Sequence, residues 1–246
     1  MKKDGTEMKE NTDTVKSEMR FKCLSASDIK LIAVITMTID HIGAALLPQY
    51  LFLRIIGRLA FPVYCYMIVN GLFYTKNCGK YVLRLLMSAF VSEVFFDLAF
   101  YGEVINKNHQ NVFFTLAIGL GVIALIEKLR LRYGMEYTIL VSAADIIIVT
   151  AGCFLAYLMK TDYSFYGVLM IYGFYSFRFN AVISCVFQVF INMILGGVQI
   201  FAILSLVPIC MYNGEKGKLE DKAKWLFYVY YPIHLGLIFV IKKTLF

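Results

Sequence analysis

An aspartate and a histidine stand side by side inside an apolar segment of the chain. Asp40 and His41 lie within residues 31–47, which are otherwise almost entirely hydrophobic. An aspartate at the centre of a membrane helix costs roughly 2.5–3.5 kcal/mol to insert, so it persists where protein groups satisfy it and usually serves function. An imidazole titrates near neutral pH and can take a proton from an amine or a hydroxyl. We therefore predict a buried catalytic centre with His41 as its proton acceptor, a structurally satisfied histidine being the alternative.

Two pairs of charged residues in the following apolar segments are candidate partners. Arg54 and Arg58 are four residues apart, as are Glu93 and Asp97, so each pair shares one face of a helix. Guanidinium groups opposite carboxylates neutralise each other well in a low-dielectric interior when the geometry is good. The pattern predicts either a structural ion-pair network or the charged wall of a substrate cavity, and Asp40 could instead pair with an arginine.

Later segments add polar groups with two possible roles each. His234 follows Tyr231 and Pro232 near the middle of the last apolar segment, and we predict that it contacts a substrate or cofactor. Tyrosines are otherwise typical of the aromatic belt at a membrane surface. Asn111 is equally suited to cap a helix, and Asp162 to open a turn. The predicted substrate cluster beside Asp40 and His41 comprises Arg54, Arg58, Glu93, Asp97, Asn111, Thr115, Asp162, Tyr163, Tyr231 and His234.

The composition narrows the class of protein. Of the 246 residues 60% are hydrophobic, against 45–50% in soluble domains, which indicates an integral membrane protein. The net charge of +7 comes from the polar N-terminal tail and short loops, with no basic stripe that would bind nucleic acid. The six cysteines form no C-x-x-C pair, so we expect no metal site or disulfide framework. Asp145 is expected to have no partner, and His109 to be exposed in a loop.

The distribution of charge sets the expected architecture. Residues 1–28 form a polar tail, predicted to be disordered, and residues 29–246 a single transmembrane helical domain. Basic and neutral loops alternate, which places the N-terminus in the cytoplasm. We predict an all-α polytopic bundle in the plasma membrane. The expected number of spans is about nine, within a range of about eight to ten. Pro62 cannot donate to the carbonyl of Arg58, so the second span should kink there. The expected spans are residues 29–47, 51–74, 81–101, 112–128, 138–159, 164–177, 180–195, 198–212 and 224–241.

Several short motifs together resemble the TraX family of membrane proteins. Each is weak singly, but they occur in the family's order from residue 29 to the C-terminus. The motifs are Thr38–Gly43, Gly57–Pro62, Tyr81–Arg84, Ser92–Asp97, Asn111–Thr115, Asp162–Tyr163 with Gly167–Leu169, Tyr212–Gly217 and Phe227–Leu235. The family is named for a conjugative-transfer protein that acetylates the N-terminus of pilin. It is related to the wider transmembrane acyltransferases, which use acetyl-CoA.

The resemblance implies a bacterial membrane acetyltransferase with His41 as the catalytic histidine, Asp40 beside it, acetyl-CoA as co-substrate and no metal. The predicted function is transfer of an acetyl group from acetyl-CoA to an amine or hydroxyl of a peptide, protein or glycan acceptor. The sequence shows no pilus context, so we do not carry pilin over as the acceptor. The alternatives are a proton-coupled transporter and a non-catalytic membrane subunit. The cations expected to meet the phosphates of acetyl-CoA are Lys80, Arg84, Arg130, Lys216 and Lys218.

Overall fold

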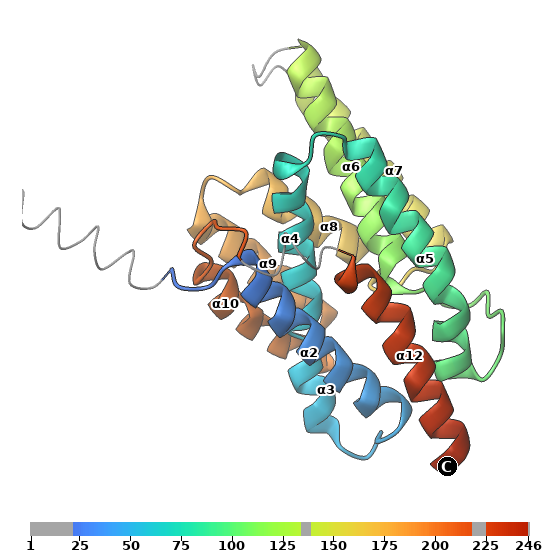
Figure 1. The fold of residues 1–246 in the computed structure, drawn as a ribbon. Coiled ribbons are helices and arrows are strands. Elements are labelled where there is room, and N and C mark those ends of the chain that lie inside the picture. Colours follow the sequence, from blue (N-terminus) through green and yellow to red (C-terminus); the bar gives the residue numbers. More distant parts are fainter. Residues whose placement is uncertain (1–21, 134–138, 218–224, 246) are drawn as a thin grey trace, which may run out of the picture.

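The computed structural model describes residues 22–133, 139–217 and 225–245, and these residues form helices joined by short loops (Figure 1). The described part contains no β-strand, only two isolated bridges. Residues 1–21 of the tail predicted to be disordered lie outside the described residues. The helices are α2 Ala26–Ala45, α3 Leu51–Gly57, α4 Ala60–Tyr74, α5 Cys78–Tyr101, α6 Val112–Tyr133, α7 Ile139–Leu158, α8 Ser164–Ser176, α9 Ala181–Leu195, the 3-10 helix η1 Gly197–Ser205, α10 Leu206–Cys210 and α12 Leu226–Leu245.

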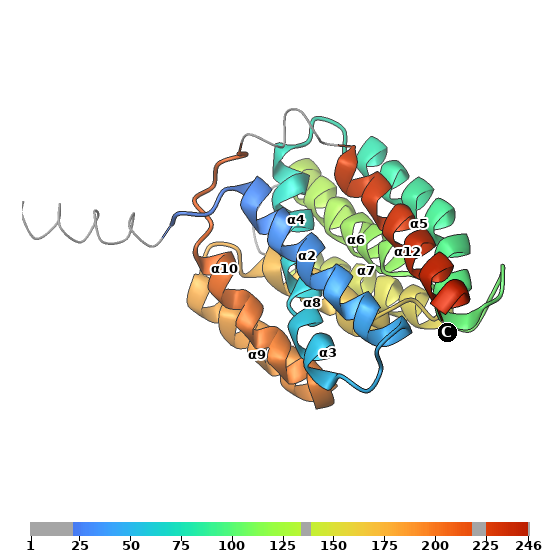
Figure 2. The ribbon, with the colours of Figure 1, turned by 60° about the horizontal axis from the view of Figure 1, so that its bottom comes forward.

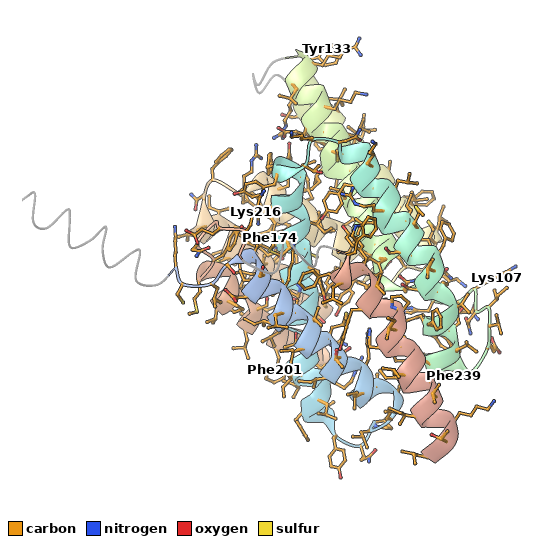
Figure 3. All side chains as sticks on the ribbon, in the orientation of Figure 1. Lys107, Tyr133, Phe174, Phe201, Lys216 and Phe239 are labelled. Carbon is orange, nitrogen blue, oxygen red and sulfur yellow. The ribbon has the colours of Figure 1, made fainter. Side chains whose placement is uncertain are left out.

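The first described helix begins at a capping box. The Ser25 side chain accepts a hydrogen bond from the backbone of Asp28, and the Asp28 carboxylate accepts one from the backbone of Ser25. This exchange satisfies two backbone donors that a helix start leaves free. The backbone of Ala26 also donates to the carbonyl of Glu215 at 2.8 Å, and Lys216 therefore lies beside the start of α2 (Figure 3). The loop before α12 thus fixes the end of the helix that carries Asp40.

The helices form a bundle in which α2 and α4 each pack against several other helices. Helix α2 packs against α3, α4 and α12, while α12 runs along α5. Helices α6, α7 and α8 pack on one another. Helix α9 packs on α8, and α9 and α10 lie on the side of the bundle opposite α5 and α12 (Figure 2). Large apolar side chains on the outer surface, such as Ile147, Phe154 and Val186, are well exposed. An apolar exterior of this extent suits contact with lipid rather than water.

The predicted segments coincide with the observed helices, but the count of nine spans is not confirmed. Among the described residues, four helices are long and apolar enough to cross a membrane, namely residues 51–74, 112–133, 141–158 and 226–245. Helices α8 and α9 have only 13 and 15 residues. A span needs about 20 residues at a rise of 1.5 Å each. These shorter helices therefore do not meet the length of a simple span.

Two predicted interruptions are present in the structure. The second apolar segment breaks between α3 and α4 beside Arg58, as the position of Pro62 predicts. Gly196 and Gly197 have φ values of 65° and 54°, a region that glycine enters without steric cost. The chain turns back there, and η1 packs against α9. Residues 180–212 therefore contain two packed elements and not one long helix.

Candidate functional site

The charged centre of the bundle is an aspartate held by two arginines. Asp40 Oδ2 lies 2.7 Å from Arg54 Nη1 and 2.5 Å from Arg58 Nη2. Arg54 Nη1 also donates to the backbone carbonyl of Asp40 at 3.0 Å. Only 10% of the Asp40 side chain and 14% of that of Arg58 are exposed. The prediction that both arginines face Glu93 and Asp97 is therefore wrong, and the alternative in which Asp40 pairs with an arginine is confirmed.

A glycine makes this three-residue cluster possible. Gly57 ends α3 directly opposite Asp40, and a Cβ atom built on it would lie only 2.1 Å from Asp40 Cβ. Residue 57 must therefore lack a side chain for α2 and α3 to approach this closely. The close approach brings both guanidinium groups within reach of one carboxylate, since Arg54 precedes Gly57 by less than one turn and Arg58 follows it.

Next to the charged cluster, two histidines from opposite ends of the chain meet. His41 Nδ1 on α2 lies 2.7 Å from His234 Nε2 on α12, and the two rings are nearly parallel with their centroids 5.0 Å apart. His234 is buried, and its Nδ1 lies 3.0 Å from the carbonyl oxygen of Tyr230. The rings of Tyr231 and Phe100 contact His41 edge-on. The structure therefore brings His234 to His41, while contact of His234 with a substrate or cofactor stays a prediction.

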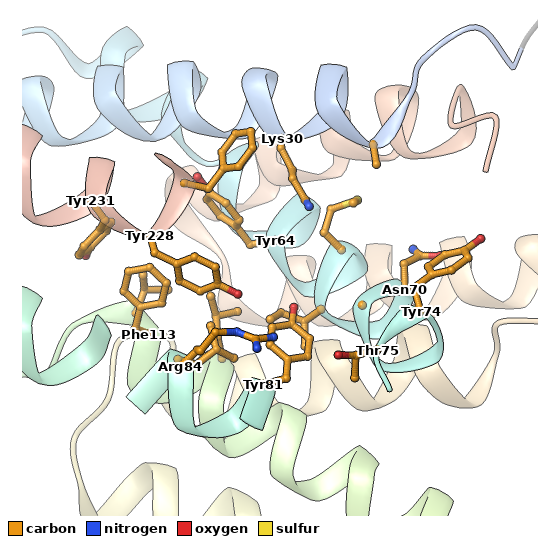
Figure 4. A pocket seen from close by; sticks show the side chains of 18 of the residues that line it. Lys30, Tyr64, Asn70, Tyr74, Thr75, Tyr81, Arg84, Phe113, Tyr228 and Tyr231 are labelled. Atoms are coloured by element: carbon orange, nitrogen blue, oxygen red, sulfur yellow. The ribbon is translucent and has the colours of Figure 1, made fainter. Parts of the chain in front are cut away.

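A cavity of about 330 Å³ lies beside the histidine pair, between α2, α4, α5, α6 and α12. Figure 4 shows Lys30 reaching from α2 and Arg84 from α5 toward the space beside Tyr64 and Tyr228. Tyr231 lines the cavity and also contacts both histidine rings. It therefore forms part of the wall between the cavity and the pair.

Lys30 was not among the predicted site residues, although its spacing from His41 along the helix could have indicated it. Ala26, Lys30 and Met37 all line the cavity. They are separated by four and seven residues, and His41 follows Met37 by four. Residues at such intervals share one face of a helix. One stripe of α2 therefore joins the cationic part of the cavity to the histidine pair.

The five cations predicted to bind the phosphates of acetyl-CoA do not form one group. Arg84 and Lys216 line the cavity, whereas Lys80 is exposed outside it. Arg130 is hydrogen-bonded to Asp145, which corrects the prediction that this acid has no partner. Lys218 lies outside the described residues. Lys107 lies in the loop after α5, far from Lys216 (Figure 3). The prediction of acetyl-CoA as co-substrate is not tested by this geometry.

Three further predicted site residues stabilise the loop that follows the C-terminal end of α5. Glu93 accepts hydrogen bonds from the backbone and side chain of Asn111, which also caps α6 by accepting from the backbone of Phe113 at 3.0 Å. Asp97 accepts from the backbone of Asn106 at 2.7 Å. The capping role is thus the observed one for Asn111, and the two acids hold the loop between α5 and α6. They do not face the arginines.

The turn before α8 connects this loop region to the charged centre. Thr115 donates to the backbone carbonyl of Asp162, and Arg58 donates to the Tyr163 hydroxyl at 3.2 Å. Tyr163 stacks on Phe61 and has a φ of 60°, which is uncommon for a residue with a side chain. Such local strain clusters at functional sites, where the surrounding structure holds it in place. The predicted site residue Tyr163 therefore joins the cluster of Asp40, Arg54 and Arg58 through its hydrogen bond with Arg58.

His109 is not the freely exposed loop residue predicted. Its Nε2 lies 3.5 Å from Asp162 Oδ1, with about a third of each side chain exposed. The hydrogen bond to Asp162 raises the pKa of His109 above its usual 6.5, and the negative charges of Glu93 and Asp97 act in the same direction, while burial opposes them. Phe96 stacks against the imidazole ring. His109 is therefore favoured in its charged form when the protein is folded.

This pair predicts a pH-dependent stability. The folded-state pKa of His109 is above the unfolded value, so the pair stabilises fully below pH 6.5 and the contribution disappears as pH rises through the folded pKa. An exposed pair contributes about 0.2–1 kcal/mol. We expect His109→Gln to lower the unfolding temperature in detergent at pH 5.5 and to have little effect at pH 8.5. An equal effect at both values would contradict an ionic role.

Apolar outer faces around a charged interior define a membrane protein with a polar site inside its helical bundle. The chain belongs to the TraX family, since the family model described as TraX protein matches residues 25–242. It is 28% identical to the probable fimbrial assembly protein FimC, serogroup H1, of Dichelobacter nodosus, over 87% of this chain and 94% of that protein. A 38-residue segment, 15% of each chain, is 58% identical to an uncharacterized protein of Rickettsia prowazekii (strain Madrid E). No solved structure matches.

These comparisons correct the predicted function. The relative that matches along almost its whole length is described as a fimbrial assembly protein, and neither match supports acetyl transfer from acetyl-CoA. The predicted acetyltransferase function is therefore wrong as stated. The sequence motifs mark the family, and they do not identify the molecule on which the site acts. The wider relation to membrane acyltransferases is not shown.

Proposed function

We propose that this chain is a membrane enzyme of fimbrial assembly that modifies a fimbrial subunit before the subunit is assembled. The family and the described role of the relative support the fimbrial context. The observation that carries the enzymatic part is the hydrogen-bonded histidine pair beside a cavity with cationic walls. A scaffold needs no such pair, because a buried polar group costs free energy unless it is fully satisfied.

In this proposal His41 is the proton acceptor for a nucleophilic group of the subunit. His41 is partly exposed, and it lies on the stripe of α2 that also lines the cavity. Arg84 and Lys216 in the cavity wall suit an anionic small molecule bound next to the pair. Asp40 forms ion pairs with both Arg54 and Arg58 and so fixes α2 against α3. The cluster then positions His41, which follows Asp40 in the chain.

We further propose that the protein is a multi-pass protein of the plasma membrane with a cytoplasmic N-terminus. The basic residues of the N-terminal tail support this orientation by the positive-inside rule. Lys30, Arg84 and Lys216 gather at the end of the bundle where α2 begins. In this orientation the cavity opens toward the cytoplasm, where anionic metabolites are abundant.

The test is the mass of a fimbrial subunit expressed together with this chain. We expect a defined increase in the intact mass of the subunit with the wild-type protein and no increase with His41→Gln. His109→Gln is the matched control, because it makes the same replacement in a loop far from the pair along the chain. Fimbriae that assemble from a subunit of unchanged mass would contradict an enzymatic role and favour a scaffold.

A further inference from the structure

The hydrogen bonds of the histidine pair determine which ring nitrogens carry protons. His234 Nδ1 lies 3.0 Å from the carbonyl oxygen of Tyr230, which can only accept. His234 Nδ1 therefore carries a hydrogen. In the neutral ring the other nitrogen, Nε2, then has a free lone pair and acts as an acceptor.

The same reasoning applies one step further along the pair. His41 Nδ1 lies 2.7 Å from His234 Nε2, and only one proton fits between two nitrogens at that distance. Since His234 Nε2 is the acceptor, the proton belongs to His41 Nδ1. The lone pair of neutral His41 is therefore on Nε2, the nitrogen that does not face His234. This nitrogen is therefore the one that can accept a proton.

The helices that carry the two rings are fixed in register. The Thr38 and Tyr230 hydroxyl groups form a hydrogen bond of 2.7 Å about one turn before the histidines on α2 and α12. The rings of Tyr230 and His234 also stack, with centroids 5.0 Å apart. The hydroxyl hydrogen bond and the His41–His234 hydrogen bond lie about one turn apart and together hold α12 against sliding along α2. The orientation of His234 toward His41 is therefore set by the fold and not by the two rings alone.

We propose that His234 is a positioning residue that keeps His41 in its Nδ1–H tautomer, so that His41 Nε2 is the base of the site. The inference rests on the proposed function only for its catalytic meaning, because the tautomer itself is a property of the resting protein. A histidine whose second nitrogen loses its partner can protonate the nitrogen that the reaction needs as an acceptor. General-base catalysis at such a centre is worth about 10²–10⁴-fold in rate.

Nitrogen NMR of the detergent-solubilised full chain, labelled with ¹⁵N-histidine, tests the proposal directly. The chain has three histidines, so His109→Gln and His234→Leu suffice to assign the signals. We expect His41 and His234 each to show a protonated Nδ1 and an unprotonated Nε2 in the wild-type protein. A wild-type spectrum with His41 protonated on Nε2 would overturn the inference.

Variants at position 234 separate positioning from mere packing. His234→Gln keeps an oxygen that can accept from His41 Nδ1, so we expect it to preserve the tautomer, whereas His234→Leu should release it to the Nε2–H form. Modification of the subunit should fall about 10²–10⁴-fold in His234→Leu and recover in part in His234→Gln. An unchanged His41 tautomer in His234→Leu would overturn the inference. If the wild-type spectrum is as expected while no subunit is modified, the proposed function fails and the tautomer assignment stands.

Discussion

Asp40→Ala should lower the free energy of unfolding by about 3–5 kcal/mol, because it leaves buried guanidinium groups without their counter-charge. Only 14% of the Arg58 side chain is exposed. Among the described residues, Asp40 is the carboxylate that is hydrogen-bonded to it. Arg54 is 29% exposed and can rotate toward solvent, so its share of the loss is smaller. Denaturant unfolding of the purified protein in detergent measures the effect.

A double-mutant cycle distinguishes a lost charge partner from a lost contact. Asp40→Ala combined with Arg58→Met removes both members of the pair, and we expect it to be less destabilised than the sum of the two single variants. The control is Glu103→Ala, which replaces an exposed acidic residue in a loop. It should change the free energy of unfolding by no more than about 0.5 kcal/mol. An Asp40→Ala loss below about 1 kcal/mol would show that the pair behaves as a solvated surface pair.

Gly57→Ala should have the second large effect, because the added methyl group has no space. Its Cβ would lie 2.1 Å from Asp40 Cβ and 2.2 Å from Asp40 Oδ1, so α3 must move away from α2. Overpacking a close-packed interior costs about 1–3 kcal/mol, and sometimes more. The movement also pulls Arg54 and Arg58 away from Asp40. We expect a lower unfolding temperature in detergent and loss of subunit modification.

Gly121→Ala in α6 is the matched control for this steric effect. A Cβ built on Gly121 meets no heavy atom within 4 Å. Alanine is also the better helix former by about 1 kcal/mol, so this variant should be as stable as the wild type or slightly more so. Equal unfolding temperatures for the two alanine variants would contradict the close approach of α2 and α3 at residue 57.

The positions of the helices could be predicted from the sequence, because apolar length and flanking charge are local properties. Each predicted segment lies over an observed helix, and the break beside Arg58 follows from the missing N–H of Pro62. The number of membrane crossings could not be predicted in this way. Helices α8 and α9 lie in predicted apolar segments, but their observed lengths of 13 and 15 residues are below that of a span.

The composition of the site was predicted more completely than its pairing. Asp40, His41, Arg58 and His234 were all chosen because ionisable groups in apolar helices need partners inside the protein. Glu93 was assigned to the wrong partner, since the spacing of charged residues along two helices does not fix which faces meet. The structure shows that Glu93 binds Asn111 instead.

The sequence by itself determined that this is a helical membrane protein of the TraX family with a buried polar centre, because hydropathy and motif order are carried by neighbouring residues. Only the tertiary structure decided that Asp40 takes both arginines and that His41 meets His234, 193 residues later. Those contacts depend on how closely α2 approaches α3 and α12. That approach is set by Gly57 and by side-chain packing between helices distant in the chain, which no local pattern encodes.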